Sequence, residues 1–211
     1  LIADTFAETR KKPLWEELYL FKQYIHNGSR VVDIGCGSGR LLSLFKGMNI
    51  DYTGIDNSEK LLKLAREQGT HAQFNGKCEF ANASILALPF LDNSFDCAFM
   101  IACLNHIPSA CQLTALKEAR RVLAPSGILC MTNFNLLRFS FTQKTVCRYG
   151  SFPNVITRWQ GHPLYYYAFT LSKLKRLCRA AGFRVCNAYY SLNGTYAHWW
   201  NGRNLVVIAK K

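Results

Sequence analysis

Residues 31–40 have the sequence Val31-Val32-Asp33-Ile34-Gly35-Cys36-Gly37-Ser38-Gly39-Arg40, and the next apolar run ends at Asp56. Apolar residues lead into a glycine-rich turn, and residues 41–45 are typical of a helix, so we expect a strand, a tight loop and a helix N-terminus. Glycines let a ligand approach the backbone, and amide groups at the start of a helix favour polar or anionic groups. Asp56 lies 21 positions after Gly35, where a second strand places an acid beside ribose hydroxyls. The pattern predicts a site for an adenosine-containing cofactor.

Length and composition indicate one domain. The chain has 211 residues, of which 49% are hydrophobic, enough for a sizeable core. We therefore treat 1–211 as a single domain with an N-terminal helical cap at about 1–28 and a substrate-facing insertion at about 136–164. The sequence has no apolar run of membrane-spanning length and no signal-peptide pattern. Nine cysteines without a C-x-x-C pair predict reduced, packed thiols in a cytoplasmic protein and no metal site.

The charge is unevenly distributed along the chain. Residues 1–96 hold 12 acids and 11 bases, whereas residues 97–211 hold 15 bases and one acid, Glu118. So large an excess of positive charge in the second half favours a polyanionic partner such as RNA, with a generally basic surface as the alternative.

Strand-like and helix-like segments alternate through most of the chain. Such alternation predicts an α/β, doubly wound, mostly parallel sheet, broken by an aromatic, basic insertion that we interpret as a lid over the substrate. The expected strands are 30–34, 51–56, 77–81, 95–101, 128–134, 183–190 and 205–209, the last two forming a terminal antiparallel hairpin. The expected helices are 14–26, 39–47, 57–67, 111–123 and 170–181.

The spacing of the glycines discriminates between adenosine cofactors. A dinucleotide site requires G-x-G-x-x-G, but Arg40 stands at the third glycine position and Gly39 comes one residue early. The resulting D-x-G-x-G-x-G pattern is typical of S-adenosylmethionine sites, which have no phosphate to bind. Asp33 is then expected to face the ammonium group of the methionine part.

Together with this loop, three later segments resemble class I S-adenosylmethionine-dependent methyltransferases. The resemblance spans about residues 30–134 and implies a seven-stranded Rossmann-like methyltransferase sheet. The segments are Ser84-Ile85-Leu86-Ala87-Leu88-Pro89-Phe90 with Asp92-Asn93-Ser94-Phe95-Asp96, then Ile101-Ala102-Cys103-Leu104-Asn105-His106-Ile107, then Leu116-Lys117-Glu118-Ala119-Arg120-Arg121-Val122-Leu123 before Pro125-Ser126-Gly127. The cofactor-binding residues implied are Asp33, Gly35, Cys36, Gly37, Gly39, Arg40, Asp56, Asn57, Ser84, Ile85 and Ile101.

Two positions depart from the family pattern. Ser84 stands where the family has an acid for the adenine amino group, and its hydroxyl can still accept a hydrogen bond, with Asn82 as an alternative. Asn105 replaces the first histidine of a His-His pair.

Segments outside this core resemble the tRNA wobble-uridine carboxymethyl methyltransferases, although Leu164 and Tyr167 depart from that pattern. The resemblance implies a tRNA partner and the substrate residues Thr9, Arg10, Lys11, Trp15, Asn105 and Tyr166, and it leaves open whether an activating protein is needed. The segments are Phe6-Ala7-Glu8-Thr9-Arg10-Lys11-Lys12-Pro13-Leu14-Trp15, Tyr165-Tyr166-Tyr167-Ala168-Phe169-Thr170 and Asn204-Leu205-Val206-Val207-Ile208.

The acceptor decides which residues have a chemical role. A carboxylate acceptor needs no general base, and Arg10 or Lys11 would position it. A nitrogen or hydroxyl acceptor must lose a proton, and His106 is the candidate base, or a histidine that only shapes the pocket wall. Two alternatives to a tRNA enzyme stay open: a methyltransferase for a small molecule, and an adenosine-binding module without catalysis.

Overall fold

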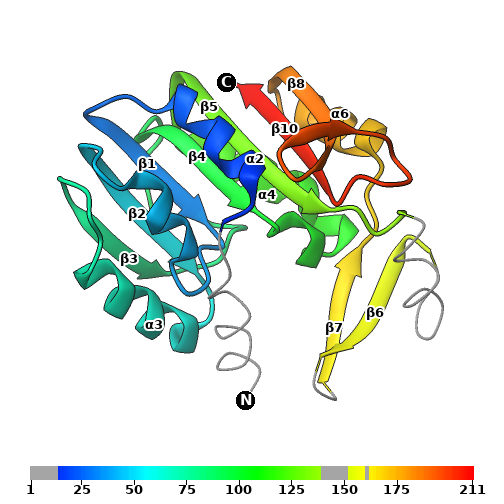
Figure 1. Ribbon diagram of the computed structural model, residues 1–211, viewed down its shortest axis with the longest axis horizontal. Coiled ribbons are helices and arrows are strands. Elements are labelled where there is room, and N and C mark those ends of the chain that lie inside the picture. The colour runs from blue at the N-terminus through cyan, green and yellow to red at the C-terminus, as the bar shows by residue number, and fades with distance from the viewer. Residues whose placement is uncertain (1–13, 139–151, 160–161) are drawn as a thin grey trace.

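The computed structural model describes residues 14–138, 152–159 and 162–211, which form a large sheet, a separate hairpin and flanking helices (Figure 1). The order of strands in the large sheet is β3-β2-β1-β4-β5-β10-β8-β9. These strands are β1 (Ser29–Ile34), β2 (Ile50–Asp56), β3 (Cys78–Asn82), β4 (Phe95–Ile101), β5 (Leu123–Phe134), β8 (Arg184–Leu192), β9 (Thr195–Ala197) and β10 (Asn204–Lys210). The α-helices are α2 (Glu16–Tyr19), α3 (Glu59–Thr70), α4 (Ser109–Val122) and α6 (Leu171–Ala180), and the 3-10 helices are η1 (Leu20–Tyr24), η2 (Arg40–Phe45) and η3 (Leu104–His106).

The first five strands are parallel, and β10 lies antiparallel between β5 and β8. This arrangement confirms the predicted doubly wound, mostly parallel sheet with a terminal antiparallel hairpin. The short strand β9 extends the seven expected strands by one. It follows β8 through Asn193 and Gly194, which both have positive φ, as a two-residue hairpin turn between right-handed twisted strands requires.

The sheet separates two apolar cores. Successive strand residues point to opposite faces, so Val31 and Val32 enter different cores. Helices α4 and α6 cover the core that contains Val32, and α2, η1 and η2 cover the other. In Figure 1, α2 accordingly lies in front of the sheet, on the opposite side from α4 and α6.

Two expected helices differ in type from the prediction. The segment expected as one helix over 14–26 forms the four-residue α2 followed by η1, and Ile25 is already extended. The helix expected over 39–47 is the 3-10 helix η2, which starts after a left-handed Gly39. Neither α2 nor η2 has a side-chain hydrogen bond at its N-cap, and such short, uncapped turns favour the tighter 3-10 geometry.

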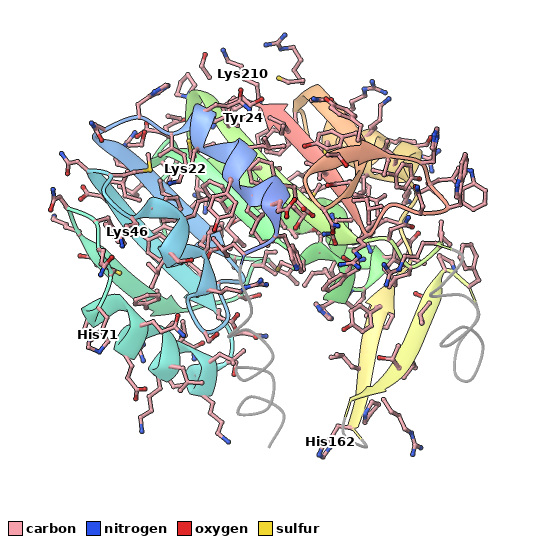
Figure 2. The ribbon with its side chains drawn as sticks, in the orientation of Figure 1. Lys22, Tyr24, Lys46, His71, His162 and Lys210 are labelled. Carbon is pink, nitrogen blue, oxygen red and sulfur yellow. The ribbon has the colours of Figure 1, made fainter. Side chains whose placement is uncertain are left out.

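The segment expected as a substrate-facing insertion contains an antiparallel hairpin of β6 (Asn154–Trp159) and β7 (His162–Tyr167). Figure 2 shows the hairpin projecting from the main sheet, with His162 at its far end. The rest of the insertion, 139–151 and 160–161, lies outside the described residues. Among the described residues no helix has the length and apolarity that a membrane crossing needs.

Phe99 on β4 tests the packing of the core under α2 and η1. Its ring is fully buried and lies 6.1 Å from Phe21 and 5.8 Å from Phe45, centroid to centroid. We expect Phe99→Ala to lower the free energy of unfolding by about 3–5 kcal/mol, because it leaves a cavity among aromatic rings. Urea denaturation measures this loss. Leu91→Ala is the control, since Leu91 is 83% exposed and its truncation should change little.

Candidate active site

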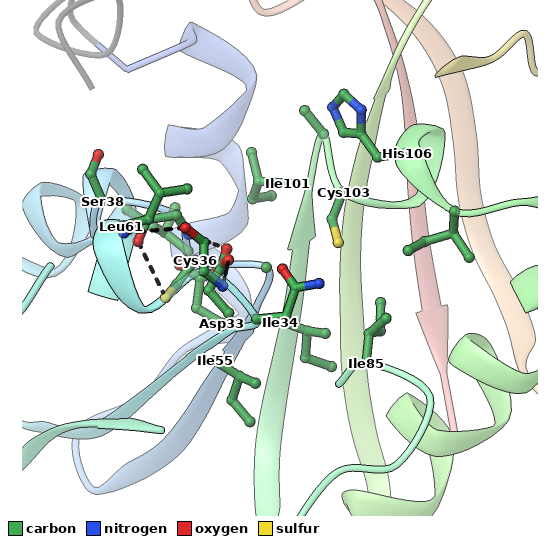
Figure 3. Close-up of a pocket in the computed structure, with 18 of the residues that line it drawn as sticks. Asp33, Ile34, Cys36, Ser38, Ile55, Leu61, Ile85, Ile101, Cys103 and His106 are labelled. Carbon is green, nitrogen blue, oxygen red and sulfur yellow. Dashed lines mark hydrogen bonds between the residues drawn. The ribbon is translucent and has the colours of Figure 1, made fainter. Parts of the chain in front are cut away.

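A cavity of about 850 Å³ lies at the carboxyl ends of β1, β2 and β4. Ligands of parallel α/β sheets bind at this edge, where loops leave neighbouring strands. We call it the first cavity. Figure 3 shows His106 and Cys103 on one side of it and Cys36, Ser38 and Leu61 on the other. The predicted cofactor residues that line it are Asp33, Gly35, Cys36, Gly37, Arg40, Asp56, Asn57, Ser84, Ile85 and Ile101.

The glycine loop has a backbone that other residues could not adopt without strain. Gly35 has a φ of +78°, and a Cβ there would lie 2.5 Å from the sulfur of Cys103. Gly39 also has a positive φ, and a Cβ there would lie 3.2 Å from the Cα of Ala65 in α3. Gly39 is outside the set of lining residues, so its contribution is to let η2 start close to α3.

Asp56 ties the glycine loop to the start of α3. Its Oδ2 accepts a hydrogen bond of 3.0 Å from the Gly37 amide, and its Oδ1 accepts one of 2.9 Å from the Ser58 amide. Ser58 caps α3, and its side chain accepts a hydrogen bond from the Leu61 amide. Each carboxylate oxygen retains a second acceptor site, and the carboxylate borders the first cavity.

Asp33 is a buried carboxyl in the wall of the same cavity. It is 2% exposed, and the Tyr52 hydroxyl donates a hydrogen bond of 2.9 Å to its Oδ2. Burial raises the pKa of Asp33 to about 7, against the lowering effect of the Tyr52 hydrogen bond. Between about pH 4 and 7 the folded protein holds a proton that the unfolded chain has released, so this group makes stability fall as the pH rises.

The two cysteines beside the loop are unreactive thiols. Burial raises the pKa of Cys36 far above its usual range and that of Cys103 to about 12, and the carboxylates of Asp33 and Asp56 raise both further. Both side chains therefore stay protonated near neutral pH, which agrees with the expectation of reduced, packed thiols.

Ser84 borders the first cavity, while Asn82 is outside its lining. The Ser84 hydroxyl accepts a hydrogen bond of 3.2 Å from the Leu86 amide, and the Asn82 amide donates to Glu59 at 3.1 Å. Of the two candidates for the adenine amino group, the structure places only Ser84 on the cavity.

His106 lies in η3 and lines the first cavity. Its Nδ1 is 3.0 Å from the carbonyl oxygen of Tyr165, and its ring lies 4.5 Å from that of Tyr166. A carbonyl oxygen only accepts, so Nδ1 carries the hydrogen and Nε2 is the basic nitrogen of the neutral ring. Its role as a general base stays a prediction.

A second cavity of about 530 Å³ shares Leu14 and Trp15 with the first. The predicted substrate residues Trp15 and Tyr166 both line it. The Arg40 guanidinium lies over the Trp15 ring in a cation–π contact, with its carbon 5.3 Å from the ring centroid. Thr9, Arg10 and Lys11, the other basic and polar substrate candidates, lie outside the described residues.

Asn105 does not line either cavity, in contrast to its predicted contact with substrate. It is fully buried, and its amide donates to the Tyr167 carbonyl at 2.9 Å while its Oδ1 accepts from the Phe134 amide at 2.8 Å. Both polar atoms are used to join η3 to β5 and β7. We correct the assignment of Asn105 to a structural one.

Several lining residues escaped the sequence analysis. Lys60 and Leu61 come from the first turn of α3, and Pro108 and Cys111 come from the start of α4. The N-cap signal at Ser58 marked the start of α3 beside Asp56 and could have located the first pair. The second pair carries no sequence signal, because it reaches the cavity only through the turn of η3.

The comparisons with known proteins agree with this geometry. Residues 32–131 match the family model described as a methyltransferase domain. The structure of a SAM-dependent methyltransferase from Methanosarcina mazei superimposes with a TM-score of 0.71 at 25% identity, covering 91% of this chain and 96% of that one. Residues 32–131 thus match a methyltransferase domain, and the similar fold supports an S-adenosylmethionine-dependent methyltransferase. The cofactor of this domain is S-adenosylmethionine.

Curated relatives differ in what they methylate. The chain is 32% identical over 111 residues to 27-O-demethylrifamycin SV methyltransferase of Amycolatopsis mediterranei, covering 52% of this chain and 40% of the relative. It is 34% identical over 127 residues to a tRNA (carboxymethyluridine(34)-5-O)-methyltransferase of Mus musculus, covering 60% of this chain and 18% of the relative. The chain spans less than half the length of these relatives.

The reassignment of Asn105 predicts a loss of stability. In Asn105→Ala the Phe134 amide and the Tyr167 carbonyl would lose their partner, so we expect the free energy of unfolding to fall by about 2–4 kcal/mol. Urea denaturation checks this, with Asn187→Ala as the control because Asn187 bonds an exposed tyrosine hydroxyl. Unchanged stability of Asn105→Ala would return the residue to the substrate candidates.

Proposed function

We propose that the protein transfers a methyl group from S-adenosylmethionine to tRNA, at a uridine side chain as a carboxylate methyl ester. The observation that carries this proposal is the pair of adjoining cavities. The second cavity meets the first at Trp15 and is lined by the aromatic rings of Phe134 and Tyr166 and by arginines. Aromatic faces and guanidinium groups are what unstacked bases and phosphates require.

The first cavity fits S-adenosylmethionine. A Cβ at Gly35 would collide with the sulfur of Cys103, so only glycine lets the loop follow this path, and the backbone of Gly35 and Gly37 borders the cavity, where a cofactor can approach it. Asp33 would face the methionine ammonium, Asp56 the ribose hydroxyls, and Ile85 and Ile101 the adenine and the neighbouring apolar wall. When bound, the cofactor supplies a methyl group already activated by a sulfonium.

With an activated methyl group, the protein has mainly to position the acceptor and exclude water. The His106 and Tyr166 rings lie side by side at the junction of the two cavities and would direct the acceptor atom to the cofactor. A carboxylate acceptor has no proton to lose, so His106 would then shape the pocket. For a nitrogen or hydroxyl acceptor its Nε2 would receive the proton.

Charge and similarity support an RNA acceptor over a small molecule. Residues 97–211 carry 15 bases and one acid, and three of those bases, Arg138, Arg158 and Arg203, line the second cavity. The mouse relative named above acts on carboxymethyluridine in tRNA. The rifamycin relative supports the alternative, a small-molecule acceptor, which the first experiment addresses.

Transfer of label from methyl-labelled S-adenosylmethionine tests the acceptor. With bulk tRNA and a metabolite extract offered together, we expect label in the tRNA, released as methanol by mild alkali because an ester is cleaved. Asp56→Ala is the matched negative variant, and Glu79→Ala on the exposed face of β3 is the control. Label confined to small molecules would refute the tRNA proposal, and alkali-stable label in tRNA would refute the ester.

From the raised pKa of Asp33 we predict how the affinity for the cofactor depends on pH. Its carboxyl is protonated below about pH 7 in the free protein, whereas an ammonium group favours the carboxylate. Calorimetry should show affinity rising from pH 5.5 to about 7, by up to roughly tenfold per unit, and then levelling. Asp33→Asn should bind more weakly and without this slope. A wild-type affinity that is independent of pH would remove Asp33 from the ammonium site.

A further inference from the structure

Two buried polar residues far apart in the sequence, Glu17 and Asn204, contact each other in the lining of the second cavity, and we call this pair the floor of the cavity. Asn204, the first residue of β10, donates through Nδ2 to the Glu17 carboxylate of α2, and the two side chains are 5% and 2% exposed. A carboxylate only accepts, so this contact fixes the orientation of the amide. Both residues line the cavity.

One atom of this pair is left unsatisfied. The Asn204 Oδ1 is buried and has no hydrogen-bond partner among the residues that the structure describes. A buried polar atom without a partner costs free energy, and Asn204 lines the cavity, so a ligand that reaches this atom and donates a hydrogen bond to it would remove that cost. Because the Glu17 carboxylate beside it also accepts, the floor favours a ligand edge that presents two neighbouring N–H donors.

The walls of the cavity are aromatic. The Trp15 and Phe134 rings are 5.4 Å apart at 73°, and Phe134 and Tyr166 are 6.2 Å apart at 69°. Rings at these angles pack edge to face against each other, so they form a continuous aromatic wall against which a planar group could lie. The volume of about 530 Å³ is sufficient for a base with its sugar and phosphate.

The remaining lining residues concentrate positive charge. Arg138 follows β5, Arg203 precedes β10, and both belong to the cavity lining, where the exposed Glu16 is the other acid. Burial lowers the pKa of Arg138, and the charge of Arg203 lowers it further. Two guanidinium groups that repel each other favour an anion that both can contact.

We propose that the second cavity binds a guanine nucleotide of the RNA acceptor, with its N1–H and 2-amino group at Glu17 and Asn204 and its phosphate at Arg138 and Arg203. Guanine is the standard base whose pairing edge presents adjacent ring and amino N–H donors. The nucleotide would lie beside the one that is methylated. This inference rests on the proposed RNA acceptor and names the chemistry by which the cavity selects it.

Mononucleotide binding tests the floor and the arginines separately. Calorimetry on the S-adenosylmethionine-bound protein compares GMP, IMP, which lacks the 2-amino group, guanosine, which lacks the phosphate, and UMP. We expect GMP to bind about tenfold more tightly than IMP or guanosine, the effect of one charge-assisted contact. UMP should bind more weakly than GMP, since its pairing edge has acceptors on both sides of its N–H.

Variants assign each preference to its residues. In Glu17→Gln and Asn204→Ala the preference for GMP over IMP should disappear, and in Arg138→Ala/Arg203→Ala the preference for GMP over guanosine should disappear. Arg179→Ala/Arg184→Ala is the charge-matched control, because both are exposed arginines, on α6 and β8, outside the cavity lining. Circular dichroism verifies that each variant is folded. If Asn204→Ala is unfolded, the conservative variant Glu17→Gln alone tests the preference for GMP over IMP.

The outcomes separate this inference from the proposed function. Equal affinity for GMP and IMP in the wild-type protein, or binding of a simple amine or amino acid in place of GMP, would overturn the guanine assignment even if tRNA is methylated. The expected preferences without methylation of tRNA would support the cavity assignment and refute the proposed tRNA activity.

Discussion

The carboxylate of Asp56 is the contact on which the candidate site depends. It stands at the end of β2, and its two oxygens accept hydrogen bonds from the loop after β1 and from the first turn of α3. The Asp56 carboxylate at the end of β2 therefore holds the glycine loop and the start of α3 together. The hydrogen bonds hold the amide of Gly37 in position while the same carboxylate faces the cavity. A neutral side chain would support the loop less strongly, because charge-assisted hydrogen bonds are about twice as strong as neutral ones.

The buried carboxyl of Asp33 lowers the stability of the folded protein at neutral pH while it provides a group for binding a cation. Its burial favours the protonated form, and only the Tyr52 hydroxyl partly compensates for the loss of water. A group with this environment weakens the folded state near neutral pH, and a cation paired with its carboxylate would offset that cost. The Tyr52 hydroxyl also fixes the direction of the carboxyl. Stability and binding are therefore opposed at this residue.

The second cavity is assembled from segments far apart in the sequence. Trp15 and Glu17 come from the N-terminal helix, Phe134 from the end of β5, Tyr166 from the β6–β7 hairpin and Asn204 from the last strand. The antiparallel insertion of β10 between β5 and β8 places Asn204 opposite Phe134, and Asn204 thereby borders the same cavity as Trp15 and Glu17. Because β10 pairs with both β5 and β8, it connects the parallel strands β1 to β5 with the last strands of the sheet, which come from the basic second half of the chain.

Local patterns account for most of what could be predicted. Alternating apolar segments predict the strands, and Asn193-Gly194 is a sequence typical of the two-residue turn that leads from β8 to β9. Helix type was less predictable, because Leu41 to Phe45 has helical spacing in either an α- or a 3-10 helix and only the left-handed Gly39 before it decides. The substrate assignment of Asn105 was wrong because it rested on the resemblance to a His-His pair. In the 3-10 turn adjacent side chains point in different directions, so His106 lines the cavity and Asn105 does not.

The sequence by itself determined the glycine loop, the acid of β2 and hence the class of cofactor, since these residues act within one βαβ unit and their spacing is read along the chain. Only the tertiary structure decided that Asn105 is buried, that Trp15 borders two cavities and that Glu17 meets Asn204. The physical reason is that those contacts depend on how the ends of distant strands and helices pack, and no periodicity within a single segment records that packing.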